Sequence, residues 1–444
     1  MKTTLKTVLT STLLAAVSTV SFALPDVIVK TDKADAVYKC GEEITVTAQV
    51  VENGKPLTGQ TVNYHYLADG RDEKRGSFVT TDKPFVFKTK LDKPGAMRID
   101  FILLDKNGKK IPIKRRLDQW DCVSGRVGAV TEPEKLLPQF ERPADFSAYW
   151  AAQRKKLNAI PVKELAKKEV YSNGKIKVYD IQVACLGKPV SGYVGIPTGG
   201  KGKYPVRIVF HGAGVRSALR HVAINGANKG FITLDINAHG ILNGHPGEYY
   251  KNLQKGELKN YYYKKFTSRT DHYFHSIIIR IIRTLEYVKT IPQWDGKNII
   301  VEGGSQGGYQ ALIAAGLDNA VTLCRASVPA FSDFYGEFFG DPKRMTRFHV
   351  ASYLRSGVPD EAQKRYLLNE YAYLDPVSFA RDIKCPTFIS LGFCDLSSPT
   401  TSVYGIFNTI PANVKKSITT YPNGIHGTSG AMPEADKYEK SLWK

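Results

Sequence analysis

The stretch that decides the fold of this chain is Val301-Glu302-Gly303-Gly304-Ser305-Gln306-Gly307-Gly308. An apolar run, residues 297–301, leads into it, and a run rich in alanine, leucine and isoleucine, residues 309–316, follows. This order predicts a strand, a sharp turn that exposes a strained serine, and a helix. Bulky side chains two positions either side of Ser305 would clash, and both positions hold glycine. We therefore predict that Ser305 is a nucleophile; the alternative is a glycine-rich turn with a solvated serine.

The sequence around this turn favours an α/β-hydrolase fold. Apolar strand-like runs alternate with amphipathic helical segments, which is typical of a mostly parallel sheet with helices on both faces. The clearest strand-like runs are 205–210, 231–236, 298–302 and 387–391, and residues 277–288 have the apolar spacing of a helix. We predict a catalytic domain over residues 143–444, preceded by a linker over residues 128–142.

Residues 24–127 have the pattern of a separate all-β domain. Residues 43–50 alternate polar and apolar side chains, the period of a half-buried strand. Similar short runs follow, separated by Asn-Gly and Asp-Gly pairs that favour turns. This pattern predicts an immunoglobulin-like β-sandwich. Because it contains no catalytic constellation, we expect it to hold or shade the active site without supplying catalytic groups.

The first 23 residues are predicted to be a cleavable signal peptide. Lys2 and Lys6 precede an apolar stretch, residues 8–20, and Ser21-Phe22-Ala23 places small residues at a cleavage site. The apolar stretch is shorter than the ~20 residues of a membrane span. No cysteine follows the cleavage point until Cys40, which argues against a lipid anchor. We expect a periplasmic or secreted protein with no integral membrane segment after cleavage; an uncleaved N-terminal anchor is the alternative.

Export would place the six cysteines in an oxidising compartment. Cys40 and Cys122 stand near the two ends of the predicted sandwich, and we predict that they form a disulfide. The other four cysteines lie in apolar contexts and are predicted to be buried thiols. None of the six has the spacing of zinc ligands, so we predict neither a metal nor a cofactor.

The chain of 444 residues carries a formal net charge of +20, which could attract an anionic partner. The lysines and arginines are dispersed, however, and no nucleic-acid-binding motif accompanies them. A solvated basic surface is therefore the favoured interpretation, and no nucleic acid is predicted as a partner.

A serine nucleophile needs a base that is itself oriented by a carboxylate. In α/β-hydrolases the chain order is serine, acid, histidine. Two histidines follow Ser305: His349, in an expected helical insertion, and His426, in a loop after a strand-like run. We predict that His426 is the base and that His349 is structural.

Asp395 directly follows the strand-like run of residues 387–394, so it is expected at the carboxyl end of a strand, where catalytic groups gather. We predict that it orients His426; a loop cap is the alternative. The negative oxygen of a tetrahedral intermediate needs fixed donors, and we predict the backbone N–H groups of Gln306 and Ala213. His211 precedes Ser305 in the chain and is predicted to shape its loop.

With these motifs the chain resembles the acetyl xylan esterase and cephalosporin-C deacetylase family of carbohydrate esterases, over about residues 140–435. The resemblance runs through Arg142-Pro143-Ala144-Asp145-Phe146, Phe210-His211-Gly212-Ala213-Gly214, Gly303-Gly304-Ser305-Gln306-Gly307-Gly308 and Leu391-Gly392-Phe393-Cys394-Asp395. It implies Ser305, Asp395 and His426 as the catalytic triad. It also implies the amides of Gln306 and Ala213 as oxyanion donors.

The chain departs from the family pattern at three places. Asn237-Ala238-His239-Gly240 stands where the family usually has Arg-Gly-Gln, and His426-Gly427 replaces His-Glu. Ala213 replaces a tyrosine-like residue. These departures leave the triad unchanged. They leave open whether the chain keeps the narrow substrate preference of the family. The added N-terminal domain likewise leaves the oligomeric state open.

Together these features predict an exported serine esterase that removes short acyl groups, acetyl above all, from acylated carbohydrates such as acetylated xylo-oligosaccharides. Three alternatives remain from the residues themselves. They are a serine peptidase of the prolyl-oligopeptidase type, a carboxylesterase of broad specificity, and a glycan-binding protein without catalytic activity.

Overall fold

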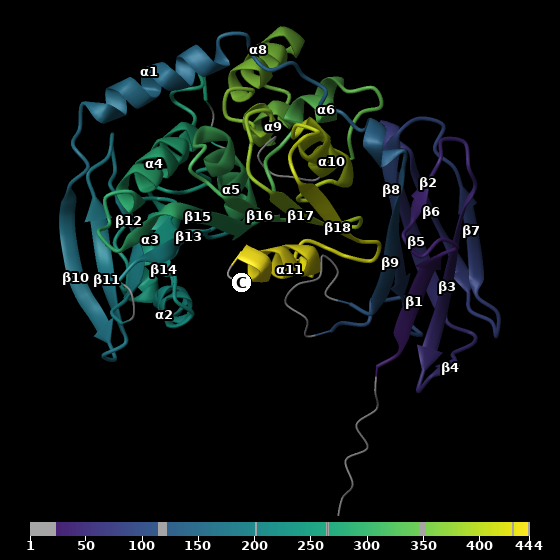
Figure 1. Cartoon of the computed structure of the whole chain (residues 1–444). Coiled ribbons are helices and arrows are strands. Elements are labelled where there is room, and N and C mark those ends of the chain that lie inside the picture. The colour runs from purple at the N-terminus through teal and green to yellow at the C-terminus, as the bar shows by residue number, and fades with distance from the viewer. Residues whose placement is uncertain are drawn as a thin grey trace, which may run out of the picture.

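A computed structural model describes residues 24–113, 122–199, 202–262, 264, 266–345, 352–428 and 430–442. It confirms the predicted fold class. N-terminal antiparallel sheets precede a larger domain built on a mostly parallel sheet, and the two parts lie side by side (Figure 1). The predicted signal peptide lies outside the described residues.

The N-terminal domain consists of two sheets that pack face to face. One contains β1 (Asp26–Thr31), β3 (Ile44–Glu52), β4 (Lys55–Pro56) and β7 (Phe85–Thr89). The other has the order β2 (Val37–Tyr38), β9 (Ser124–Thr131), β8 (Gly95–Leu103), β5 (Thr61–Ala68) and β6 (Glu73–Val79). The inward side chains of β3 are buried at every second position, as predicted. Aromatic rings join the sheets; the rings of Phe78 and Phe85 stack with centroids 3.9 Å apart.

The predicted disulfide between Cys40 and Cys122 is wrong, because the two sulfur atoms are not bonded to each other. Cys40 Sγ donates to Glu132, just beyond the end of β9, whereas Cys122 lies just before its start. The eight residues of β9 separate the two thiols by about 26 Å, and a disulfide requires Cα atoms within about 7 Å. Cys40 and Cys122 therefore lie near opposite ends of β9, too far apart to form a disulfide.

β9 also corrects a predicted boundary. The strand continues to Thr131, so the first four residues of the predicted linker, 128–131, belong to the sandwich sheet. The segment that follows contains a short 3₁₀ helix, η2 (Pro133–Lys135), and leads to α1 (Phe146–Asn158).

The second domain is built on a nine-stranded sheet. Its order is β10 (Glu164–Ser172), β11 (Ile176–Val183), β12 (Val190–Pro197), β14 (Ile232–Asn237), β13 (Tyr204–Phe210), β15 (Trp294–Gly304), β16 (Leu323–Ser327), β17 (Thr387–Gly392) and β18 (Lys416–Tyr421). The strands from β14 to β18 in this order are parallel, and β10, β11 and β12 extend the sheet antiparallel. β12, β14 and β17 are buried along their whole length, as expected of central strands covered on both faces.

Helices cover both faces of this sheet (Figure 1). α4 (Tyr273–Val288), α5 (Gln306–Leu317), α9 (Pro376–Ala380) and α10 (Thr400–Thr409) lie on one face, and α2 (Arg220–Asn228) and α11 (Pro433–Leu442) lie on the other. The remaining helices are α3 (Gly247–Lys255), α6 (Phe334–Phe339), α7 (Ser352–Arg355) and α8 (Glu361–Tyr371). α4 confirms the helix predicted over residues 277–288.

The sandwich packs beside the β18 edge of the large sheet, with β8 and β9 toward the catalytic domain (Figure 1). Two backbone contacts show how close this approach is. The N–H of Gly128 on β9 donates to the carbonyl of Pro422 at 2.8 Å. A Cβ at Gly128 would lie 2.5 Å from the carbonyl oxygen of Phe393, so the position has no room for a side chain.

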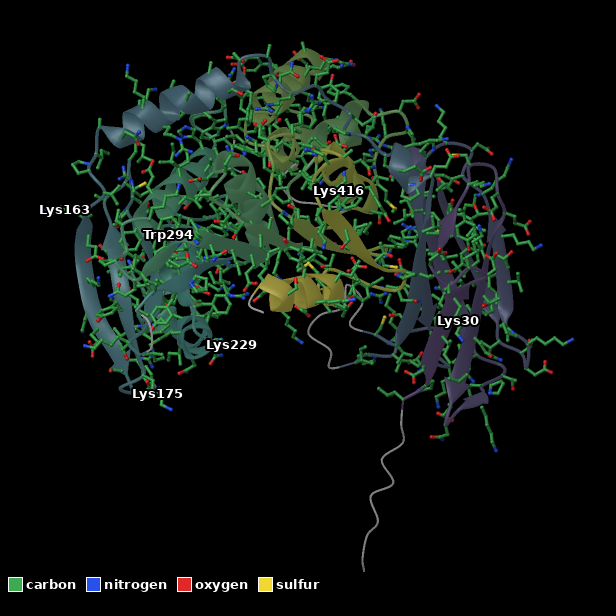
Figure 2. The ribbon with its side chains drawn as sticks, in the orientation of Figure 1. Lys30, Lys163, Lys175, Lys229, Trp294 and Lys416 are labelled. Atoms are coloured by element: carbon green, nitrogen blue, oxygen red, sulfur yellow. The ribbon has the colours of Figure 1, made fainter. Side chains whose placement is uncertain are left out.

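The basic side chains are spread over the molecule rather than gathered on one face. Of the lysines labelled in Figure 2, Lys30 lies on the sandwich, whereas Lys163 and Lys175 lie at the opposite end, beside β10 and β11. Across the residues that the structure describes, no helix has the length and apolar character needed to span a bilayer.

Candidate active site

Ser305 sits in the sharp turn between β15 and α5 with φ 58° and ψ −119°, a conformation that costs a non-glycine residue free energy. The turn is possible because its neighbours have no side chains. A Cβ at Gly303 would lie 2.5 Å from the carbonyl carbon of Gly307, and a Cβ at Gly307 would lie 2.0 Å from the carbonyl oxygen of Phe210. Both glycines are therefore required by the packing, and the predicted strand, turn and helix are all present.

The structure brings the three predicted triad residues together. His426 Nε2 lies 2.8 Å from Ser305 Oγ, and His426 Nδ1 lies 2.7 Å from Asp395 Oδ2. Ser305, Asp395 and His426 follow the carboxyl ends of β15, β17 and β18, which are neighbouring or near-neighbouring parallel strands. The topology thus places three residues that are up to 121 positions apart in sequence on one edge of the sheet.

Asp395 is held rigidly by its own loop. Its Oδ1 accepts the backbone N–H groups of Ser397 at 2.8 Å and Ser398 at 2.9 Å, which leaves Oδ2 for His426. Asp395 is 2 % exposed, so no bulk water competes for these bonds. A carboxylate in this arrangement fixes the imidazole with its proton on Nδ1 and leaves Nε2 free to accept the serine proton.

The environment of His426 suits a base that works near neutral pH. Burial by itself would lower the pKa of His426, but the hydrogen bond to Asp395 and the charge of Asp395 outweigh it, and the pKa is raised above its ordinary value of 6.5. The His426 side chain is 34 % exposed, so a substrate can reach it.

The two residues predicted to donate backbone N–H groups to the oxyanion belong to segments that meet at Ser305. Gln306 is the first residue of α5, so its N–H has no partner within the helix and points with the positive end of the helix dipole. The loop after β13 approaches from the other side; a Cβ at Gly212 would lie 3.8 Å from Ser305 Cβ. Ala213, the next residue in that loop, is exposed. The predicted donors therefore belong to the start of α5 and to the loop after β13, the two segments that meet at Ser305.

Two histidines, His211 and His239, hold the loop after β13 that carries Ala213, which we call the oxyanion loop. The Nδ1–H of His211 donates to the Gly212 carbonyl at 2.6 Å, and the Ala238 N–H donates to His211 Nε2 at 3.1 Å. His239 donates through Nε2 to the Gly214 carbonyl at 3.1 Å. Burial lowers the pKa of His211 to about 4 and that of His239 to about 3, so both are neutral. His211 thus lies in the loop-shaping position predicted for it.

Sequence reasoning did not identify His239 and Tyr261. The Tyr261 hydroxyl accepts the Gly214 N–H at 3.1 Å and donates to the Gln306 side-chain oxygen at 2.6 Å, so it joins the two loops that carry the oxyanion donors. The one signal for His239 was the departure from the family pattern at residues 237–240. Tyr261 had no signal, because it reaches the site from a loop after α3.

A cavity of about 590 Å³ opens beside the oxyanion loop. Its wall includes Ala213, Gly214, Leu258 and Tyr262, and three lysines, Lys251, Lys255 and Lys259. The cavity thus combines ring, aliphatic and hydrogen-bonding groups along the loop that carries Ala213.

His349, predicted to be structural, lies outside the described residues. Within the described part of the chain, no group of three or more histidine, cysteine, aspartate or glutamate side chains could hold a metal ion.

Comparison with known proteins identifies similar chains. The acetyl xylan esterase (AXE1) family profile matches residues 130–442. The chain is 31 % identical over 415 residues to the acetyl esterase Axe7A of Xylanibacter ruminicola, covering 92 % of this chain and 88 % of the relative.

Two solved structures share the fold of the larger domain. The acetyl xylan esterase from Paenibacillus sp. R4 superposes with a TM-score of 0.56 at 20 % identity, over 70 % of this chain and 97 % of that one. Acetyl xylan esterase 1 from Thermoanaerobacterium sp. JW/SL YS485 gives 0.55 at 21 % identity, over 66 % and 92 %.

Proposed function

The chain belongs to the acetyl xylan esterase (AXE1) family, and from this premise we propose that it removes acetyl groups from xylan-type oligosaccharides outside the cytoplasm. Its membership makes it an acetyl esterase, a carboxylic ester hydrolase. The observation that carries the proposed mechanism is the hydrogen-bonded chain from Ser305 through His426 to Asp395.

In the first half-reaction, Ser305 Oγ attacks the ester carbonyl while its proton moves to His426 Nε2. The carbonyl oxygen becomes negative and is stabilised by the N–H groups of Gln306 and Ala213. The C–O bond to the sugar then breaks, and the sugar oxygen leaves with the proton from Nε2. Acetyl-Ser305 remains.

In the second half-reaction, a water molecule attacks acetyl-Ser305 and gives its proton to His426 Nε2. The bond between the acetyl carbon and Ser305 Oγ breaks, the proton returns to Oγ, and acetate leaves. Asp395 remains ionised throughout and offsets the transient charge of the imidazolium. Because both steps need neutral His426, whose pKa is raised above 6.5, activity falls as the pH drops through that raised pKa.

The sugar alcohol is proposed to lie in the cavity beside Ala213. Alanine at that position leaves the oxyanion loop without a bulky side chain, and Tyr262 offers a ring face against which a sugar can pack. A pocket wall discriminates by only about 1–3 kcal/mol per methylene, so some cleavage of propionyl and butyryl esters is expected as well.

The test of substrate class compares kcat/KM for acetyl, butyryl and octanoyl esters of one alcohol, followed by acetate release from acetylated xylo-oligosaccharides. We expect the acetyl ester to be the best of the three and acetate to be released from the oligosaccharides. The same oligosaccharides after alkaline deacetylation serve as the blank. A preference for octanoyl esters, or cleavage of a peptide bond, would contradict this assignment.

Export is proposed on the sequence of the first 23 residues. The mature chain is expected to begin at Leu24 and to be recovered from the periplasm or the medium, because cleavage follows Ser21-Phe22-Ala23. Intact mass and N-terminal sequencing of the protein made in a Gram-negative host measure this directly. A cytoplasmic protein that retains Met1 would contradict export.

A further inference from the structure

The sandwich carries a buried cluster of charges next to the catalytic acid. Arg98, on β8, is 1 % exposed. It forms a bidentate pair with Asp100, from Nε to Oδ2 at 2.8 Å and from Nη2 to Oδ1 at 2.6 Å. Arg126, on β9, adds a second cation, with its Nε 3.4 Å from Asp100 Oδ1. The sequence of the sandwich gave no reason to expect this group.

The third nitrogen of Arg98 reaches across the domain boundary. Its Nη1 donates to the carbonyl of Cys394 at 2.5 Å. Cys394 is fully buried and directly precedes Asp395, so this bond fixes the peptide from which the catalytic acid projects. The Arg98 guanidinium has a fixed planar geometry, and the fork to Asp100 sets the direction of its remaining donor.

The loop that carries His426 is held by the same domain. Pro422 accepts the Gly128 N–H, and the Asn423 side chain donates to the Val29 carbonyl at 3.0 Å and to the Arg126 carbonyl at 2.5 Å. The acid and the base therefore both stand on loops that contact the sandwich. Ser305, in contrast, is carried by β15 in the middle of the large sheet.

The charges of the cluster complement Asp395. Two arginines and one aspartate leave one net positive charge, and it lies on the sandwich side of the loop that carries Asp395. Burial alone would lower the pKa of Arg98, but Asp100 and, after it, Cys394 and Asp395 raise it, so the guanidinium stays charged. Burial raises the pKa of the adjacent Cys394 thiol to about 12, which keeps that group neutral. The charged groups around Asp395 therefore include this cluster and His426.

We propose that Arg98, together with Asp100 and Arg126, is a positioning element of the catalytic centre: it fixes the backbone of Asp395 and balances the charge of that carboxylate. The inference rests on the proposed function, because it requires Asp395 and His426 to act in the reaction. It assigns the sandwich a part in catalysis that is exerted through the position of Asp395.

The test measures kcat, KM and the pH dependence of kcat/KM for an activated acetate ester in full-length variants. Arg98→Met should lower kcat by about 10- to 100-fold with little change in KM, because a shift of the acid by about 1 Å misaligns the base. It also removes a positive charge, which favours the imidazolium form of His426. The acidic limb of kcat/KM should therefore move to higher pH, by on the order of half a unit.

The other variants test the direction in which the acidic limb of kcat/KM moves. Asp100→Asn removes a negative charge and should move the acidic limb to lower pH. The double variant Arg98→Met/Asp100→Asn restores one net positive charge and should return the limb to its wild-type position, while kcat stays low because the bond to Cys394 is absent. Arg98→Lys keeps the charge and should leave the limb in place. If Arg98→Met does not fold, Asp100→Asn and Arg98→Lys still carry the comparison.

Arg283→Met is the matched control. Arg283 is on α4, away from the interface between the domains, and like Arg98 it is fully buried. It also donates to backbone carbonyls, those of Leu157 and Ile160. It should lower the melting temperature without moving the limb. Limbs that coincide in all variants, or that move equally in Arg283→Met, would overturn the proposal. Inactive wild-type protein would instead overturn the proposed function.

Discussion

Replacing Ser305 with alanine is expected to lower kcat for an activated acetate ester by about 10⁶-fold without disturbing the fold. The hydroxyl is the one atom removed, and it lies 2.8 Å from the base that activates it. Alanine has the same backbone limits as serine, so the strained turn is neither relieved nor worsened. The measurements are steady-state rates, covalent labelling by a fluorophosphonate, and the melting temperature.

Ser390→Ala provides the matched control for this experiment. Ser390 is also a buried serine close to the site, but its hydroxyl contacts Ser327 Oγ at 3.1 Å and not His426. Labelling by the fluorophosphonate should persist in Ser390→Ala and be lost in Ser305→Ala. Wild-type turnover by folded Ser305→Ala would refute the whole mechanism.

Asp395→Asn is expected to lower kcat by about 10⁴-fold. Asparagine presents an N–H₂ group or a weaker acceptor to His426 Nδ1, so the imidazole loses the tautomer that leaves Nε2 free to accept a proton. The substitution also removes the charge that raises the pKa of His426, and burial alone would then lower it. The remaining activity should therefore have its acidic limb at lower pH than the wild type, as a pH profile of kcat/KM would show.

Asp375→Asn separates this effect from a loss of stability. Asp375 is buried like Asp395, and its two oxygens accept the backbone N–H groups of Val377 and Asp333, so it stabilises the start of α9 without facing the triad. Its asparagine variant should melt at a lower temperature but keep the wild-type pH profile. An equal loss of kcat in both variants would show that Asp395 acts through folding alone.

The catalytic strand, turn and helix could be predicted because steric limits act locally there. A serine in so tight a turn needs glycines at fixed positions, and Gly303 and Gly307 show that need directly in the sequence. The order of the acid and the histidine then follows from a parallel sheet in which successive strands present their carboxyl ends on one edge. The strands that carry Ser305, Asp395 and His426 meet this rule.

The antiparallel end of the sheet was harder to predict. β10 is exposed along nearly its whole length and lacks the apolar alternation by which a strand is recognised. Its backbone pairs with β11, but its side chains include charged residues that discourage pairing with a second molecule. An edge strand of this kind is specified by its neighbour and not by its own pattern.

Contacts between distant segments could not be predicted at all. Cys40 and Cys122 bracket the sandwich in sequence, yet the length of β9 keeps them apart. Arg98 and Asp100 are separated by one residue on a strand and gave no sign of function, because their role depends on the loop after β17 arriving at the same place. Tyr261 likewise gains its importance from two loops that the fold brings to it.

The glycine on β9 has a consequence for how such an enzyme can change over evolutionary time. Domains that meet through flexible linkers can be exchanged by recombination, because neither depends on the shape of the other. Here a sandwich strand touches the backbone next to the catalytic acid with no room for a single methyl group at Gly128. A sandwich from another protein joined to this hydrolase would need a glycine at the position in its own strand that corresponds to Gly128. Selection would therefore act on the two domains as one heritable unit, although the chain folds them as two.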